Sequence, residues 1–600
     1  MSEILKRNQV PLEQTWDLTA LFKSKEDFQA SMEDAKVKTK ALVDYKGRLG
    51  ESAQVFYQAL QLMEDLNIQL SALGTYAGLE QAVDATNVET QELNMMFGMA
   101  ITEIATQLTF FENEIMSLPE ATFNGYFTEE PRLEEYRKNL SEIYDEKNYK
   151  LDDKTEEAFA AMGEVTSAPY NTYSISKASD MVFDDIQDSE GKTHPNSFNL
   201  FEGKYEFSED PVLRKNAYAS FNKTLKQYKN TYAAIYATHV KKEVTMSRLR
   251  GYQSVTQMLL KSQLVTEEMY HRQIDVIYKE LAPHMRKFAG LLKKELKLDK
   301  VNFYDLKAPI DTSYNPPATY EQARETVLKS LEIMGPDYLA IMKEGFDNRW
   351  IDYADNAGKA SGAFCASPYA AHPYILVTFQ NNMRDAFTLT HELGHAGHFY
   401  LANKHQKYFN TEPSTYTVEA PSTMNEMLLG RYLLDNNDDP KMKKWVILQF
   451  MGTYYHNFVT HLLEAAYQRK VYDFAEKGQP LTAQLLCDTK LEVLRGFWQD
   501  AVDIDEDAGM TWMRQPHYYM GLYPYTYSAG LTASTACSEM IFNEGQPAVD
   551  RWLELLKTGG RLKPLDLLKV AGMDFTSDEP VQKAVAYVGS LIDQLADLCD

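Results

Sequence analysis

The sequence predicts a mainly α-helical protein with a small β-sheet packed next to one buried helix. Apolar residues recur at three- and four-residue steps from about residue 24 to 163, from 208 to 298, and nearly to the end of the chain after residue 400. The best strand is the segment 374–379, which is rich in β-branched and aromatic residues. It ends twelve residues before His391, which lies in the predicted buried helix at 388–400, so strand and helix should pack together.

The first part of the chain is expected to be a bundle of long helices with short connections. Ser24 is the predicted N-cap of its first helix, with Asp27 at the third helical position. Residues 180–195 predict a β-hairpin that turns at about residues 189–191, where Gly191 favours a tight turn.

These changes of pattern divide the chain into three expected parts. They are an N-terminal helical lobe over residues 1–180, a β-hairpin connection over 181–204, and a third domain over 205–600 that contains the helix at 388–400. Long helical segments on both sides of that helix suggest two lobes that meet over it.

Composition and charge narrow the class of protein. The 600 residues are 44% apolar and 24% charged, as in an ordinary soluble globular protein. The formal net charge of −25 argues against nucleic acid or an anionic membrane as partner. The N-terminus has no apolar core of a secretory signal, and no charge-free apolar run is long enough to span a bilayer. The four cysteines are scattered, which makes a disulfide framework unexpected and favours a cytoplasmic location.

The helix at 388–400 contains His391, Glu392 and His395 in the pattern H-E-x-x-H. The two histidines lie one helical turn apart on the same face, near enough to share one metal ion. The helix is apolar nearly all round, and burying two imidazoles and a carboxylate is costly unless they are paired or bound to metal. We therefore predict one zinc ion per chain, with Glu392 beside its open position as general base for a water whose pKa zinc lowers to roughly 7.

A catalytic zinc needs a third protein ligand, and two candidates stand out. His398 returns to the face of His391 two turns later, but the two positions are roughly 10 Å apart along the helix axis. Glu419 comes from outside the helix, and a loop and second helix running back past the first could deliver it. We favour Glu419 as ligand, which makes His398 a supporting or substrate-facing residue. Glu426 is expected on the same face as Glu419.

Several motifs resemble those of the thimet oligopeptidase family of zinc metallopeptidases. The segment His391–His398 followed by the E-A-P-S block that begins at Glu419 is similar to that family's metal-binding pattern. Further segments resemble the oligoendopeptidase F branch of the family across nearly the whole chain, namely 15–18, 304–309, 358–362, 373–376, 509–512, 516–519 and 523–527.

The resemblance implies a zinc endopeptidase that hydrolyses internal bonds of short, unfolded oligopeptides. It implies a mostly helical, two-lobed body around a deep substrate channel that excludes folded proteins. Short peptides would be the partners. With nucleic acid and membrane already disfavoured by the charge, we expect no such partner, and we expect a monomer or a weak homo-oligomer.

The resemblance also implies roles for single residues. Transition-state donors fall on His517 and Tyr527, and less firmly on Tyr523 and Tyr525. A neutral phenol or an imidazolium aimed at the developing oxyanion would stabilise it. Residues expected to contact substrate are Tyr374, Ile375 and Leu376, whose strand pairs with substrate backbone in the family, together with Gly358, Gly362 and His398.

Three positions depart from the family pattern. The branch commonly has Arg-Gln where this chain has His456 and Asn457, and an acidic residue where His461 stands. These changes indicate either an altered side-chain preference or neutral repacking. Two rivals to the endopeptidase remain: a metallo-exopeptidase on the same scaffold, and a peptide-binding scaffold with a structural metal site. Glu392 argues against the second, because a structural site needs no base beside an open position.

Overall fold

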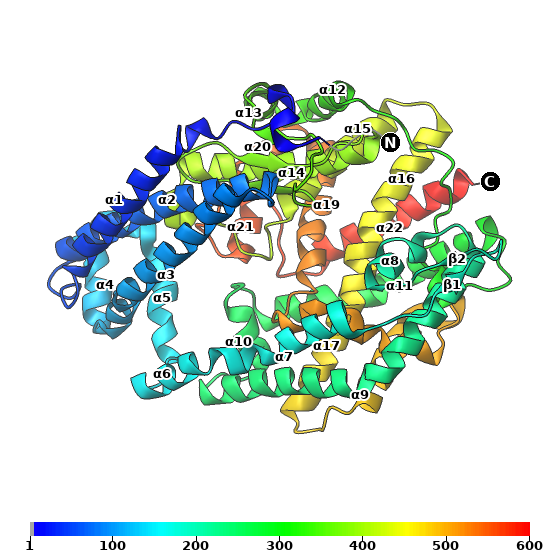
Figure 1. The fold of residues 1–600 in the computed structure, drawn as a ribbon, viewed down its shortest axis with the longest axis horizontal. Coiled ribbons are helices and arrows are strands. Elements are labelled where there is room, and N and C mark those ends of the chain that lie inside the picture. Colours follow the sequence, from blue (N-terminus) through cyan, green and yellow to red (C-terminus); the bar gives the residue numbers. More distant parts are fainter. Residues whose placement is uncertain (1–4, 600) are drawn as a thin grey trace. The chain divides into compact units, whose positions relative to one another are not determined.

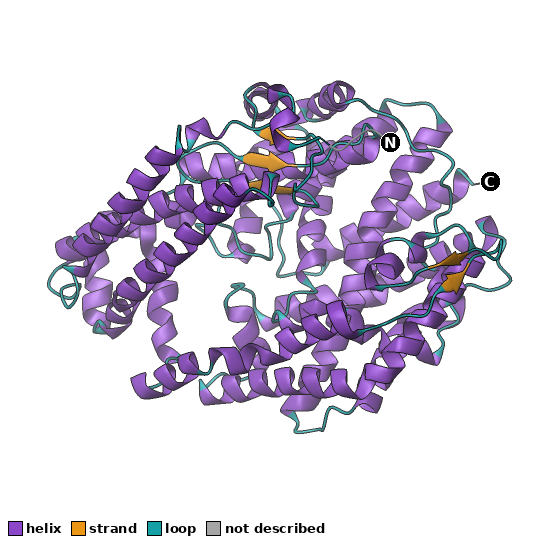
Figure 2. Ribbon diagram, viewed as in Figure 1, coloured by secondary structure: helices purple, strands orange, loops and turns teal. Residues whose placement is uncertain are grey.

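The computed structural model describes residues 5–599, which form mainly α-helices with two small sheets in this range (Figures 1 and 2). The chain divides into two compact units. Unit 1 comprises the chain up to Tyr149, Pro316–Tyr432 and Cys537–Met573, and unit 2 comprises Lys150–Asn315, Leu433–Ala536 and the chain from Asp574. This division differs from the three consecutive parts expected from the sequence. Two long helices, α15 (Ala420–Asp435) and α19 (Thr526–Glu544), continue through unit boundaries. Because the helical pattern of the sequence is unbroken at these two positions, the sequence does not mark them as boundaries.

Unit 1 starts with the predicted helical bundle. Ser24 caps its first helix, because the Ser24 side chain accepts a hydrogen bond from the Asp27 backbone N–H at 3.1 Å. The five helices pack around a shared core of Phe, Tyr, Leu and Ala side chains. They are α1 (Lys25–Val43), α2 (Ala53–Val83), α3 (Val88–Ser117), α4 (Glu120–Glu129) and α5 (Arg137–Asp145).

The rest of unit 1 surrounds a three-stranded sheet. Its strands are β3 (Ile351–Asp352), β4 (Phe364–Ala366) and β5 (Tyr374–Leu376), in the order β3-β5-β4. β5 pairs with β3 in parallel and with β4 antiparallel. Helix α14 (Met383–His405) contacts β4 and β5, so the predicted sheet beside this helix is confirmed (Figure 2). The other helices are α12 (Tyr320–Ser330), α13 (Pro336–Asp347), most of α15, the end of α19, α20 (Gln546–Thr558) and α21 (Pro564–Val570).

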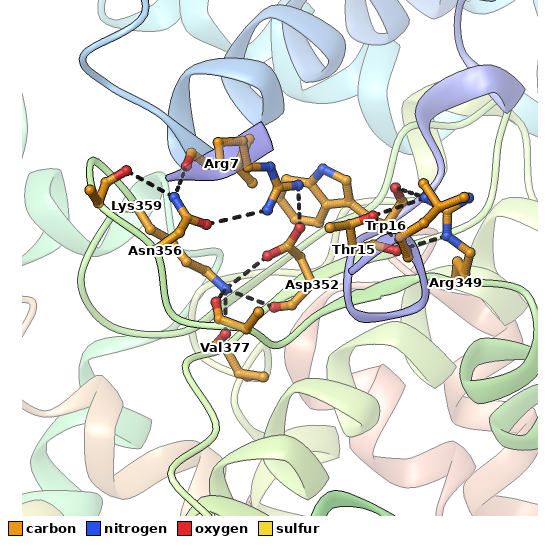
Figure 3. A network of polar contacts seen from close by, with 12 residues as sticks. Arg7, Thr15, Trp16, Arg349, Asp352, Asn356, Lys359 and Val377 are labelled. Atoms are coloured by element: carbon orange, nitrogen blue, oxygen red, sulfur yellow. Dashed lines mark hydrogen bonds and ion pairs between the residues drawn. The ribbon is translucent and has the colours of Figure 1, made fainter. Parts of the chain in front are cut away.

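A buried ion pair fixes the loop that joins β3 to β4 (Figure 3). Asp352 and Lys359 are joined by a 2.8 Å bond between Oδ1 and Nζ, and their side chains are 0% and 2% exposed. The Lys359 ammonium also donates to the carbonyls of Ala354 and Val377. Arg7 completes the network with a 2.5 Å bond to the other Asp352 oxygen. Because removing one partner of such a pair costs about 3–5 kcal/mol, the loop conformation is strongly specified.

Unit 2 is a second helical body. Its small sheet is the predicted hairpin, in which β1 (Ile186–Gln187) pairs antiparallel with β2 (Thr193–His194) around Gly191 at φ +80°. The predicted helices at 208–250 and 266–298 are confirmed as α9 (Pro211–Leu249) and α11 (Glu267–Glu295). The others are α6 (Asp153–Ala161), α7 (Gly163–Ile175), α8 (Phe198–Gly203), α10 (Val255–Lys261), α16 (Pro440–Tyr454), α17 (His461–Glu476), α18 (Ala483–Trp498), most of α19, and α22 (Glu579–Asp597). Across residues 5–599, every helix is too short or too polar to cross a lipid bilayer.

Candidate active site

Helix α14 carries the H-E-x-x-H motif through the interior of unit 1. Asn382 caps the helix by accepting a hydrogen bond from the Asp385 backbone N–H at 3.0 Å. The His391 and His395 ring centroids are 5.0 Å apart, as their spacing of one turn requires. Glu392 is 6% exposed and His395 is 9% exposed, as the apolar flanks predict, while the His391 side chain is 27% exposed.

A close approach between two backbones brings the third acidic group to these histidines. At Gly394 in α14, a Cβ atom would lie 2.3 Å from the Pro421 carbonyl oxygen and 2.6 Å from the Ser422 Cα. Only glycine fits this contact, which seats the start of α15 directly on α14. Glu419, two residues before Pro421, thereby places its Oε2 atom 3.4 Å from His391 Nε2 and 3.3 Å from His395 Nε2.

The three side chains His391, His395 and Glu419 fit a single zinc ion. Two ligand atoms that each lie about 2.05 Å from a tetrahedral zinc are about 3.3 Å from each other, close to the observed spacing. One ligand atom from each residue lies within 4.8 Å of the other two. Two imidazoles and one carboxylate leave a fourth position open, which is the pattern of catalytic rather than structural zinc.

Neighbouring groups orient these side chains. His391 Nδ1 lies 2.6 Å from Glu426 Oε1, a contact that directs its Nε2 atom toward Glu419. The Ser422 hydroxyl donates to Glu419 Oε2 at 2.9 Å. Glu426 and Ser422 therefore hold the proposed ligands in position. Sequence reasoning placed Glu426 on the right face but gave it no role.

His398 does not join the metal-binding group. It is 1% exposed, and neither ring nitrogen has a hydrogen-bond partner among the described residues. Burial lowers the pKa of His398 to about 3, which leaves the ring neutral near pH 7. The geometry thus supports Glu419 over His398 as the third ligand.

Glu392 lies near β4, an outer strand of the sheet. Burial raises its pKa above the ordinary value, although His391 and His395 pull the pKa down. Burial, and then the Glu392 carboxylate, raise the pKa of the Cys365 thiol in β4. A carboxylate with a raised pKa is a stronger base than one in water, which suits proton abstraction.

The expected substrate strand needs a correction. Tyr374, Ile375 and Leu376 form β5, which is the central strand of the sheet and is fully buried. A central strand has both edges occupied, so these residues have no free backbone edge for a peptide. Within the described sheet, the strand with an unoccupied outer edge on the α14 side is β4.

The two glycines expected to face substrate differ from each other. A Cβ atom on Gly358 (φ +83°) would lie 2.5 Å from Asp84 Oδ1, and the Gly358 carbonyl accepts a 2.8 Å bond from the Ala85 N–H. Gly358 therefore docks the loop on the end of α2. Gly362 (φ +89°) has no atom within 4 Å of its Cβ position and is exposed just before β4.

The predicted transition-state donors gather in unit 2. The Tyr527 hydroxyl lies 3.4 Å from His517 Nε2, and the Tyr523 ring is 5.1 Å from the His517 ring between centroids. Burial lowers the pKa of His517 to about 4, so its ring is neutral near pH 7. Tyr525 differs, because it is 0% exposed and its hydroxyl donates to Gln263 Oε1 at 2.5 Å. Tyr525 is therefore a core residue.

The positions that depart from the family pattern support this cluster. The His461 ring stacks on Tyr527 with centroids 4.0 Å apart and planes inclined by 11°. His461 Nδ1 lies 2.7 Å from Glu464 Oε2, and its Nε2 lies 3.1 Å from His456 Nε2. Asn457 instead donates to the Thr453 carbonyl of its own helix. Sequence reasoning missed Glu464, although its spacing of three residues from His461 is that of helical neighbours.

Comparison with known proteins gives consistent matches along the chain. The family described as "Peptidase family M3" matches residues 205–587, and that described as "Oligopeptidase F" matches residues 114–183. The chain is 35% identical to the oligopeptidase PepF of Bacillus subtilis over 608 residues, covering 100% of this chain and 90% of the relative.

Solved structures agree with these matches. A putative peptidase from Chlamydophila abortus superimposes with a TM-score of 0.93 at 26% identity, covering 99% of this chain and 100% of that one. Oligoendopeptidase-F from Enterococcus faecium superimposes with a TM-score of 0.73 at 26% identity, covering 96% of this chain and 99% of that one.

Proposed function

Because the chain belongs to peptidase family M3 and is a metallopeptidase, we propose that it is a zinc-dependent endopeptidase of short, unfolded oligopeptides. The observation that carries the proposal is the group of His391, His395 and Glu419, whose nitrogen-to-oxygen distances of 3.3 and 3.4 Å suit one zinc ion. Glu392 lies within the same motif and supplies the base that a structural site would not need.

The mechanism assigns one task to each side chain. Bound zinc would supply Lewis-acid polarisation and would lower the pKa of water to roughly 7. Glu392 takes the proton from the attacking water and then delivers it to the leaving amine. Its burial favours this exchange, because the raised pKa lets the carboxyl group hold the proton between the two steps. Glu426 keeps His391 in the tautomer that presents Nε2.

The donors to the developing oxyanion are His517 and Tyr527 in this proposal. Both are neutral groups that would donate a hydrogen bond, since burial depresses the pKa of His517 to about 4. Tyr523 is the second phenol of this cluster, with its ring 5.4 Å from that of Tyr527. A donor aimed at an oxyanion typically contributes about 10²–10³-fold to turnover.

We further propose that β4 aligns the substrate. An extended peptide can add to an edge strand through main-chain hydrogen bonds. β4 contacts α14, and burial together with the Glu392 carboxylate raises the pKa of the Cys365 thiol in β4. A peptide on the outer edge of β4 would therefore pass near Glu392. Gly362, two residues before β4, has open space around its Cβ position.

The names of the relatives support part of the proposal. The relatives' printed names, oligopeptidase and oligoendopeptidase, support short peptides as substrates and internal cleavage. We propose a cytoplasmic monomer or weak homo-oligomer that encloses its substrate in a channel.

The test is a peptide of about ten residues, acetylated at its N-terminus and amidated at its C-terminus, digested with and without a zinc chelator. Internal cleavage that the chelator abolishes and added zinc restores is the expected result. A carboxy-exopeptidase would leave this peptide intact and cleave only its free-acid form. Binding without any cleavage would instead favour a peptide-binding scaffold.

A further inference from the structure

A cavity of about 330 Å³ lies inside unit 2, next to the proposed oxyanion donors. His461 and Gln515 line it, together with Pro516, which directly precedes His517. Since one water molecule takes about 30 Å³, the cavity has room for more than solvent bridging two side chains. Many of the side chains that line it are charged.

Seven ordinarily ionised side chains of the described residues line the cavity, of which four are basic and three are acidic. Three of the basic groups already have acidic partners. Arg514 donates to Glu202 and Glu206 at 2.8 Å, Lys307 donates to Glu206 at 2.8 Å, and Lys177 lies 3.9 Å from Glu202. Counted over the lysine, arginine and glutamate side chains alone, the lining has one net positive charge (four minus three).

The fourth basic group, Lys490 in α18, has no such partner. It is 4% exposed, and its ammonium makes no hydrogen bond and no ion pair within 4.0 Å to the described residues; it lies over the Tyr467 ring, 5.5 Å from the ring centroid. The nearest counter-charge, Glu464, is already engaged, because it contacts His461 at 2.7 Å and accepts from Gln515 at 2.6 Å. A buried ammonium without an acceptor is costly. Burial accordingly lowers the pKa of Lys490 to about 8.

We propose that this cavity binds a carboxylate group of the peptide substrate, with the Lys490 ammonium as its hydrogen-bond donor. The inference rests on the proposed peptidase function and names a feature that the enzyme would recognise in its substrates. A single carboxylate supplies the missing acceptor and cancels the one net positive charge of the lining. A dianion such as phosphate would instead leave one negative charge uncompensated in a cavity that already contains Glu202, Glu206 and Glu464.

The carboxylate has two possible sources in a peptide: the C-terminus and an Asp or Glu side chain. Both present the same two oxygens to Lys490. A substrate group can reach the cavity from solvent, since the lining side chains of Lys177, Glu202 and Lys307 are 22%, 33% and 25% exposed. Lys490 is 4% exposed and is the most buried of the four basic groups.

The test compares fluorogenic peptides of one sequence, all acetylated at the N-terminus. One ends in a free acid and one in an amide, and two further amides carry Glu or Gln at the residue before the end. With wild-type enzyme, KM for the free acid or for the Glu-containing amide is expected to be about tenfold or more below that of its neutral partner, as the loss of a hydrogen bond to a charged group implies. The pair that shows the difference identifies the source.

In Lys490→Met, the ratio of KM values between acid and neutral peptide should fall to near one. Lys470→Met is the matched control, because Lys470 lies in α17 with a 42% exposed side chain paired to Glu492, and it should keep the wild-type ratio. If Lys490→Met does not fold, acetylated tripeptide acids and amides as inhibitors of the wild-type enzyme replace it, and the acid should inhibit at about tenfold lower concentration.

The outcomes separate the two proposals. Cleavage of the amidated peptides with equal KM for acid and neutral forms would overturn the carboxylate site and leave the endopeptidase standing. A ratio that persists in Lys490→Met would also overturn it. No cleavage of any amidated peptide would contradict the endopeptidase itself.

Discussion

Replacing Gly394 with alanine tests how the metal site is assembled. The added methyl carbon would lie 2.3 Å from the Pro421 carbonyl oxygen, while ordinary contact begins at 3.4 Å. The start of α15 must therefore move away from α14 by about 1.1 Å (3.4 minus 2.3). Such overpacking costs about 1–3 kcal/mol, and the better helix propensity of alanine returns less than about 1 kcal/mol of it.

This displacement acts on Glu419, which belongs to the same backbone segment. Metal–ligand distances are held within about 0.2 Å, so a shift of about 1 Å cannot be absorbed at the zinc. We expect the zinc affinity of Gly394→Ala to fall by at least the 10–100-fold that changes around metal ligands typically cause. Activity at limiting zinc should fall in parallel.

Competition with a fluorescent zinc chelator measures that affinity, and circular dichroism checks the fold. Gly98→Ala is the control, because Gly98 lies within α3 of unit 1 and a Cβ atom there meets nothing within 4 Å. The control should bind zinc as the wild type does. Wild-type zinc affinity in a folded Gly394→Ala would refute the claim that the glycine contact positions Glu419.

Three further predictions follow from the site and its surroundings. Glu419→Ala should lose zinc on dialysis while His398→Ala keeps it, and metal analysis showing the reverse would exchange their roles. Burial raises the pKa of Glu206, but Arg514 and Lys307 outweigh it and lower the pKa to about 2, so its contribution of about 3 kcal/mol is present above pH 4.5 and is lost as the pH falls toward 2. Glu206→Gln should therefore lower the melting temperature at pH 3 by about half or less of the drop at pH 7, and an equal loss at both pH values in calorimetry would contradict this. Peptides of about ten residues should be cleaved far faster than reduced casein, because an enclosed channel admits on the order of ten residues at about 3.3 Å each, and equal rates by mass spectrometry would exclude the channel.

Local pattern predicts the elements of this protein well. The Ser24 cap, the hairpin around Gly191 and the buried helix α14 each depend on residues close together in sequence. The same holds for the His391–His395 pair, which one helical turn brings together. Such features follow from period and capping chemistry alone.

Features that depend on tertiary contact could not be predicted from pattern. Nothing in the composition of β5 shows that it is a central strand, because a buried edge strand and a buried central strand are both apolar. The contact of Gly394 with Pro421 joins two helices whose relative placement the sequence does not encode locally. The unpaired Lys490 likewise becomes visible only when the partners of all its neighbours are known.

The central claim, a zinc site with Glu392 as base, is tested most directly by measuring zinc content and turnover together in Glu392→Gln. The amide keeps the size of the side chain and leaves His391, His395 and Glu419 unchanged, so zinc should remain at one per chain. Turnover of a blocked decapeptide should fall by at least about 10²–10⁴-fold, the usual contribution of a general base. Stoichiometric zinc with near-normal turnover would contradict the proposed mechanism.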